Sequence, residues 1–218
     1  MRAAMLKEGV KSCGECPLGP ESRCRFAPKK VAAGTQVWSQ GEDEVPLLFV
    51  KEGVLGLTAS DADGRELLAG VRGPKSMLGL EALRNEPARA TVVALTETTV
   101  CRTTVRDLGP DRTPHESATL LDFALDELGQ QSRDVDLRSG PAISRVARFL
   151  LRHGSLLAPG RRAPFSKRHV AALLAVRPET MSRCLRTLER EGLISEGKAV
   201  VVKNRARLEA VASGESLE

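Results

Sequence analysis

The spacing of apolar residues changes twice along the chain, and each change indicates a different kind of structure. Up to about residue 30, glycines and prolines are too frequent for a long helix, which predicts irregular chain. From residue 34 to 105, short β-type runs alternate with glycines, as in a small barrel or roll. These runs cover residues 47–50, 53–58, 67–71, 91–95 and 98–105. Asp-Ala-Asp-Gly at 61–64 supplies a hairpin turn between two of them.

From residue 114 onward the apolar period is helical. Apolar and small residues at steps of three and four form a heptad seam, the pattern of a helix that pairs with another helix. The seam consists of Ala118, Leu121, Leu125, Leu128, Ser132 and Val135. After a break at Ser139-Gly140-Pro141, the spacing predicts a second amphipathic helix, then two shorter helices and a hairpin over residues 194–202.

The two shorter helices have the layout of a helix-turn-helix. Ser166 is a good N-cap for the first, and Pro178 fits the first position of the second. The second helix carries an apolar stripe of Met181, Cys184, Leu185 and Leu188 and a polar stripe of Glu179, Ser182, Arg183 and Arg186. A recognition helix needs both stripes, because one packs on its own domain and the other reads bases.

The polar stripe has the chemistry for reading DNA. Arg183 has the fork geometry for guanine, and Glu179 offers an acceptor for the amino group of cytosine. Lys167 and Arg168 precede them at a helix N-terminus and are expected to hold phosphates. The pattern alone fits a solvated surface helix as well as a DNA-reading one.

Composition narrows the class of protein. The chain has 218 residues, of which 41% are hydrophobic and 28% charged, as in an ordinary globular protein. Only 3% are aromatic, which disfavours base stacking, while a net charge of +5 mildly favours a polyanionic partner. No apolar run is long enough to span a membrane, and Lys7, Glu8 and Lys11 argue against a signal sequence. We therefore expect a cytoplasmic protein without membrane contact.

In that compartment the five cysteines are expected to be metal ligands or reactive thiols rather than disulfides. Cys13, Cys16 and Cys24 follow a C-x2-C-x7-C pattern in Gly/Pro-rich chain, and Cys101 lies in the last β-type run. Four thiolates suit an iron–sulfur cluster or a zinc ion, and spacing alone does not separate the two. Cys184 belongs to the apolar stripe and is predicted to be a core residue.

Several motifs resemble the CRP/FNR family of transcription regulators. Val-Arg-Pro-Glu-Thr-Met-Ser-Arg at 176–183, followed by Leu188 and Glu-Gly-Leu-Ile at 191–194, looks like the family's helix-turn-helix. The β-type region resembles its sensory roll through Gly53-Val54, Asp63-Gly64-Arg65-Glu66, Gly73-Pro74 and Gly79. The long seam helix stands where the family has its dimerisation helix.

The resemblance implies an α+β fold in four parts. These are a cysteine-rich segment at 1–30, a β-roll like a cyclic-nucleotide-binding domain at 31–112, a dimerisation helix at 113–138 and a winged helix-turn-helix at 139–218. It further implies a transcription activator that acts with RNA polymerase and binds palindromic double-stranded DNA as a homodimer. The dimer would pair through Leu121, Leu125, Leu128 and Val135, and the DNA contacts would be Lys167, Arg168, Glu179, Thr180, Ser182, Arg183 and Arg186.

The roll departs from the family's nucleotide-binding pattern. Nucleotide-binding members carry Gly-Glu before an Ala-Leu pair and a later Pro-Arg, which hold ribose and phosphate. Here Leu80 and Ala88 replace the Glu and the Arg, and a buried phosphate without its arginine would be an unpaired charge. We therefore expect no cyclic nucleotide, although Glu81 and Arg89 lie one position away and would restore the site if the alignment shifts.

The cysteines resemble those of the FNR subgroup, whose members bind an oxygen-labile 4Fe–4S cluster through an N-terminal triplet and one cysteine of the roll. The resemblance implies one cluster per subunit, bound by Cys13, Cys16, Cys24 and Cys101. The alternatives are a zinc-containing or cluster-free regulator that senses nitric oxide, redox state or a small effector, or an iron–sulfur electron carrier. Because there is no Rossmann, P-loop or Ser/His/Asp pattern, we do not expect an enzyme.

Overall fold

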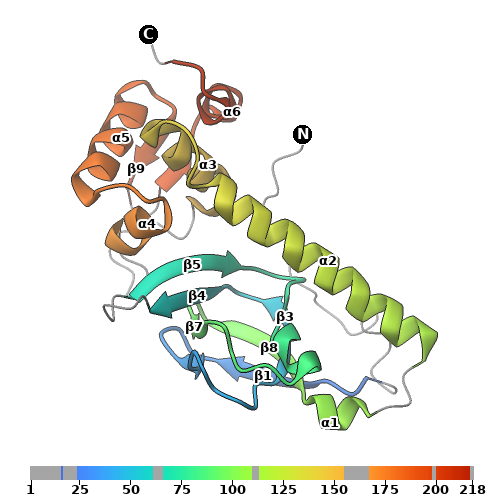
Figure 1. The fold of residues 1–218 in the computed structure, drawn as a ribbon. Coiled ribbons are helices and arrows are strands. Elements are labelled where there is room, and N and C mark those ends of the chain that lie inside the picture. The colour runs from blue at the N-terminus through green and yellow to red at the C-terminus, as the bar shows by residue number, and fades with distance from the viewer. Residues whose placement is uncertain are drawn as a thin grey trace. The chain divides into compact units, whose positions relative to one another are not determined.

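The structure is a computed structural model that describes residues 16, 24–60, 66–109, 113–154, 167–197 and 200–216. These residues divide into two units, one ending at Ser132 and the other beginning at Arg133. The first unit holds the strands of a β-roll, the short helix α1 (Val105–Leu108) and most of the long helix α2 (Pro114–Asp136), and the second holds the helices α3 to α6, between residues 142 and 213, with a small hairpin (Figure 1). No helix within the described ranges is long and apolar enough to cross a membrane.

Two antiparallel sheets of four strands form the roll (Figure 1). The first sheet has the order β1-β8-β3-β6, with β1 Ala27–Val31, β8 Thr98–Thr103, β3 Leu47–Glu52 and β6 Met77–Leu78. The second has the order β2-β7-β4-β5, with β2 Gln36–Trp38, β7 Thr91–Ala94, β4 Leu55–Ser60 and β5 Glu66–Arg72. Sequence neighbours β4 and β5 pair with each other as a hairpin.

The first sheet is buried on both of its faces. Val50 of β3 belongs to the core that this sheet shares with the second, together with Leu55 and Val92. Phe49 points to the other face, because successive residues of a strand alternate sides, and packs there with Phe123 of a helix. Double burial explains why β3 is a continuous apolar run rather than an alternating one.

The long helix α2, Pro114–Asp136, covers this second face of the first sheet. It follows the short helix α1, Val105–Leu108, which comes directly after β8. Leu120 and Phe123 of α2 are buried there, and the Phe123 ring centroid lies 5.5 Å from that of Phe49. The helix begins with a proline in its first turn, where the missing N–H costs nothing.

A buried ion pair fixes α2 to the roll. The side chain of Arg72, at the end of β5, is only 2% exposed. Its Nε donates to Glu127 Oε2 at 2.7 Å, and its Nη2 donates to Glu127 Oε1 at 2.6 Å. One turn further along α2, Gln130 Nε2 donates to Ser76 Oγ at 3.3 Å. Both ends of the ion pair lie within the first unit.

The described part of the second unit has four helices, of which α4 and α5 have the helix-turn-helix layout, and a two-stranded hairpin that we call the wing. Its elements are α3 Ala142–His153, α4 Lys167–Leu173, α5 Pro178–Arg190, β9 Ile194–Glu196, β10 Val200–Val202 and α6 Arg205–Ser213. Val146 and Leu150 of α3, Leu185 of α5 and Leu208 of α6 are almost fully buried. β9 and β10 pair as the antiparallel hairpin that the sequence predicts.

The α+β architecture expected from the resemblance is confirmed, whereas several local expectations are wrong. The region up to residue 30 is not wholly irregular, because β1 begins at Ala27 and pairs with β8. The run expected over 98–105 ends at Thr103, since Thr104 caps α1 by accepting from the Asp107 amide. The sequence predicted no helix after the hairpin, but α6 follows it. The turn at 61–64 and the predicted cap Ser166 lie outside the described residues.

Replacing Glu127 tests how far the roll depends on the buried pair. Glu127→Gln removes the carboxylate that binds the buried guanidinium of Arg72 with both oxygens, so the free energy of unfolding should fall by about 3 kcal/mol. Chemical denaturation of the purified variant measures this loss. Glu44→Gln changes an exposed carboxylate of the same roll and should shift stability by less than about 0.5 kcal/mol. Equal stability of the two variants would show that the pair contributes nothing net.

Candidate functional site

The polar stripe of α5 forms the first candidate site. The turn from α4 into α5 is tight, with Ala175 in the left-handed region at φ 50° and Pro178 in the first turn of the helix. The apolar stripe Met181, Cys184, Leu185 and Leu188 is buried, as predicted. On the opposite side Glu179, Arg183 and Arg186 are exposed, and Thr180 and Ser182 are half-buried. One face is therefore anchored while the other remains available to a ligand.

The basic residues of α4 lie beside the wing. Lys167 and Arg168 are both exposed at the start of α4. Lys167 Nζ forms an ion pair with Glu196 Oε2 of β9 at 3.0 Å, an interaction that the sequence analysis did not anticipate. The Glu196 amide in turn donates to Glu189 Oε1 of α5 at 2.8 Å. A phosphate bound by Lys167 would therefore compete with a carboxylate.

Arginines of the second unit hold the turn that leads into the recognition helix. Arg138 Nε donates to the carbonyl of Leu173 at 3.0 Å. Arg145 Nη1 donates to the carbonyls of Leu174 at 3.2 Å and Ala175 at 3.1 Å. These carbonyls end α4 and lack partners within the helix, so the guanidinium groups supply them. The two arginines thereby set the point from which α5 departs.

Arg148 and Arg152 bind carbonyls at the ends of α2 and α6. Arg148 donates to the carbonyls of Asp136 at 2.6 Å and Ser139 at 2.7 Å, and also to Ala212 of α6 at 2.8 Å. Arg152 Nη1 donates to the carbonyl of Arg133 at 3.0 Å. These residues were not predicted from the sequence, although Arg145, Arg148 and Arg152 follow one another at helical steps of three and four. That spacing was the available signal.

The cysteines form the second candidate site. Cys101 of β8 is buried in an apolar cluster with Phe49 and Phe123, and Cys16 packs against the same cluster. Cys24 lies three residues before β1, and β1 pairs with β8 so that Pro28 stands opposite Cys101. Cys24 Sγ makes a weak hydrogen bond to the carbonyl of Phe26 at 3.8 Å. The fold thus places Cys16 and Cys101 at one apolar cluster, and it places Cys24 four residues before the strand position that pairs with Cys101.

The described chain stops short of a complete metal centre. Cys13 lies outside the described residues. Within the ranges described, no three Cys, His, Asp or Glu side chains come close enough together to hold a metal ion. Cys184 is a buried residue of the α5 core, as predicted, and burial raises the pKa of its thiol. A thiol of this kind is a poor ligand because it resists deprotonation.

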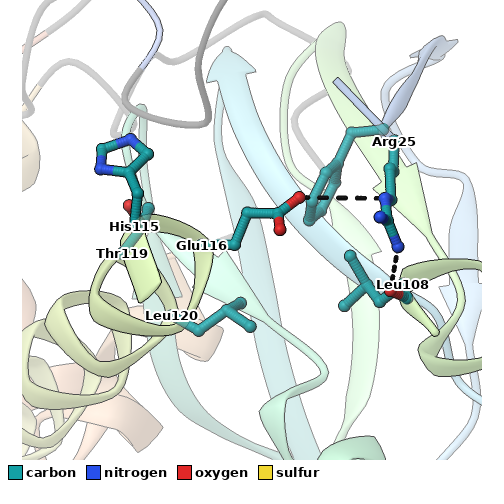
Figure 2. A pocket seen from close by; sticks show the side chains of 7 residues that line it. Arg25, Leu108, His115, Glu116, Thr119 and Leu120 are labelled. Atoms are coloured by element: carbon teal, nitrogen blue, oxygen red, sulfur yellow. Dashed lines mark hydrogen bonds and ion pairs between the residues drawn. The ribbon is translucent and has the colours of Figure 1, made fainter. Parts of the chain in front are cut away.

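A charged contact lies directly beside Cys24. Arg25 donates to the carbonyl of Leu108, and its Nε lies 3.8 Å from Glu116 Oε1 (Figure 2). Both side chains line a small pocket between the first turn of α2 and the end of α1. The amide and hydroxyl of Thr113 hydrogen-bond to Glu116 and lower the pKa of its carboxyl, with smaller contributions from Arg25 and His115. The sequence analysis did not single out either partner.

Glu81 and Arg89, which would restore a cyclic-nucleotide site if the alignment shifted, lie close to each other and to Glu86. Ala88 is buried in the core of the roll. The side chain of Arg89 is 73% exposed and pairs with Glu86 at 2.5 Å. That hydrogen bond lowers the pKa of Glu86. Glu81 accepts only a long hydrogen bond, of 3.5 Å, from the Arg89 amide.

Comparison with known proteins identifies both halves of the chain. A family model described as the Crp-like helix-turn-helix domain matches residues 144–211, and one described as the cyclic nucleotide-binding domain matches residues 28–109. The cyclic AMP receptor protein of Thermus thermophilus is 31% identical over 196 residues, which cover 87% of this chain and 89% of that protein. The transcriptional activator protein FnrL of Cereibacter sphaeroides is 28% identical over 232 residues, 90% of each chain.

Solved structures agree with this assignment. A CRP-family transcriptional regulator of Thermus thermophilus superposes with a TM-score of 0.72 at 26% identity, covering 87% of this chain and 98% of the other. FixK2 of Bradyrhizobium japonicum, at 23% identity, gives a TM-score of 0.71 and covers 88% of this chain and 99% of the other. The second likeness shows the fold alone.

Proposed function

Because the chain belongs to the CRP/FNR family of DNA-binding transcription regulators, we propose that it binds a palindromic site as a homodimer under the control of an oxygen-labile 4Fe–4S cluster. The observation that carries the sensing part is the meeting of Cys16 and Cys101 at one apolar cluster, with the strand after Cys24 paired to β8. Cys13 is proposed as the fourth ligand. RNA polymerase is the proposed protein partner, with activation as the outcome, in line with the name of the relative FnrL.

The donor set fits such a cluster. Its four thiolates are soft ligands, and the chain contains the Gly/Pro-rich segment needed to bring three of them to the roll. Cys13, Cys16, Cys24 and Cys101 would hold the cluster, which would supply oxygen-sensitive redox chemistry. Holding it would also tie Cys24 to the roll at Cys101, and loss of the cluster would release this tie. Leu80 and Ala88 supply neither carboxylate nor guanidinium, so the proposal includes no cyclic nucleotide.

The homodimer is proposed to pair through α2. The side chains of Leu121, Leu125, Leu128 and Val135 are exposed by 60%, 57%, 60% and 64% respectively. They occupy heptad positions on the face of α2 that does not contact the roll. Four large apolar side chains in one exposed stripe indicate an interface, and a second copy of the chain presents the matching stripe. Gly129 within the helix weakens it, which suits a reversible interface.

The exposed face of α5 is proposed to read the bases. Arg183 would donate both arms of its guanidinium to guanine O6 and N7, and Glu179 would accept from the opposing cytosine. Thr180, Ser182 and Arg186 lie on or beside this face and are proposed to contact the same half-site. Lys167 and Arg168 at the start of α4 would hold backbone phosphates.

Protein purified without oxygen should contain iron and acid-labile sulfide. Replacing any one of Cys13, Cys16, Cys24 or Cys101 by Ser should remove both, because the cluster needs all four thiolates. Cys184→Ser is the matched control and should retain them, since this thiol is buried in the α5 core. Metal analysis with an absorbance spectrum makes the measurement. Zinc at full occupancy without sulfide would contradict the proposal and indicate a structural zinc site instead.

Base reading and phosphate binding should separate in DNA titrations. Arg183→Ala should cost about 1–3 kcal/mol on a palindrome with TTGA…TCAA half-sites and relax the preference at one base pair. Lys167→Ala should weaken all sequences alike, although by less than a free lysine would, because Glu196 already pairs with it. Fluorescence anisotropy at several salt concentrations measures both effects. Equal loss for Arg183→Ala on palindromic and random DNA would contradict direct reading.

The seam should set the association state. Leu125→Glu places a charge in the exposed stripe and should move anaerobic protein at micromolar concentration from dimer to monomer in sedimentation velocity runs. Val201→Glu, at an exposed apolar residue of the wing, is the matched control and should remain dimeric. Exposure of the wild type to air should shift it in the same direction as Leu125→Glu. A wild type that stays dimeric in air while losing DNA affinity would replace dissociation by reorientation within the dimer.

A further inference from the structure

The segment that carries Cys24 reaches the first turn of α2 through the side chain of Arg25. Arg25 follows Cys24 directly, and its guanidinium lies between the carbonyl of Leu108 and the carboxylate of Glu116 (Figure 2). Leu108 is the last residue of α1, whose carbonyl has no partner inside that helix. We call this arrangement, from Arg25 to Leu108 and Glu116, the Arg25 bridge.

Glu116 caps the first turn of α2 together with Thr113. Its carboxylate accepts from the Thr113 amide at 2.8 Å, and its own amide donates to the Thr113 hydroxyl at 3.2 Å. This reciprocal pair is a capping box, which satisfies two backbone donors at the helix start. Arg25 adds a positive charge to the carboxylate that completes the box. The bridge therefore stabilises the turn from which the dimerisation helix begins.

The neighbours of Arg25 tie it to the cysteine site. Phe26 and Cys16 both pack against the cluster that contains Cys101, whereas Arg25 is directed to the helix ends. Backbone pairing with β8 starts only at Ala27, so no strand hydrogen bond fixes Arg25 itself. Its side chain is 38% exposed, and a charge pair at that exposure is weak unless its backbone is held.

We infer that Arg25 is a positioning residue that transmits the state of the cysteine site to the first turn of α2. This inference rests on the proposed function, because a ligated Cys24 is what would hold the adjacent backbone. With Cys24 bound, the bridge forms and the capping box is reinforced. When Cys24 is released, Arg25 is no longer held between the two helix ends, and the first turn of α2 opens more often.

Amide hydrogen exchange in the full-length protein tests the bridge at the Glu116 and Ser117 amides. In the wild type, exchange should be about two- to fivefold slower in anaerobic, cluster-loaded protein than after air exposure, the range given by an exposed charge pair. Arg25→Met should remove this difference while iron and sulfide contents stay at the wild-type level. Arg25→Lys, which keeps the charge, should restore part of it.

Two further variants separate coupling from simple destabilisation. Glu116→Gln keeps an acceptor for the capping box but loses the charge, so in a double-mutant cycle it should couple to Arg25→Met only in cluster-loaded protein. Arg106→Met, at an exposed arginine of α1, should leave the difference intact. Persistence of the difference in Arg25→Met, or coupling of equal size in air-exposed protein, would overturn the bridge alone. Wild-type protein without iron and sulfide would overturn the proposed function and the bridge together.

Discussion

The buried pair between Arg72 and Glu127 decides which way the long helix faces. Removing a guanidinium from water is costly, and the bidentate carboxylate of Glu127 is what makes that position of Arg72 tolerable. With Glu127 turned to the roll, Leu120, Phe123 and Gln130 must face it too, because they recur at steps of three and four. The seam from Leu121 to Val135 then lies on the opposite face of the helix, where it is exposed to solvent. One helix thus carries two interleaved stripes, one for its own roll and one for a partner.

Two charged contacts of different strength hold α2, and the difference matters for control. The Arg72 pair is buried near the middle of the helix, where loss of one partner would expose an uncompensated charge. The contact between Arg25 and Glu116 is partly exposed at the first turn and can open at little cost. With the inferred coupling, a disturbance that starts at Cys24 would loosen the beginning of the helix while its middle stays in place. Graded anchoring of this kind lets a local change alter pairing without unfolding the roll.

Apolar periodicity predicted the elements that pack directly on a core. It missed the elements that are defined by strand pairing or by charged contacts. The stripe from Met181 to Leu188 and the run at β3 were evident because each meets a core directly. β1 was missed because Lys29 and Lys30 leave it no apolar alternation, and only its register against β8 defines it. The roll-facing stripe of α2 was hidden because Glu127 and Gln130 are polar. Cysteine spacing indicated the ligand chemistry, whereas the meeting of Cys16 with Cys101 depends on how distant segments pack.

The arginines of the second unit hold its helices together, which limits how DNA binding can be controlled. Arg138 and Arg145 bind the last carbonyls of α4, and Arg148 joins Asp136 and Ser139 to Ala212 of α6. Moving α4 and the turn into α5 relative to α3 would therefore break several charge-assisted hydrogen bonds at once. A small free-energy input at the cysteine site could not do this. It could shift the pairing of a weak seam, which would bring two intact recognition helices to, or away from, the spacing of a palindrome.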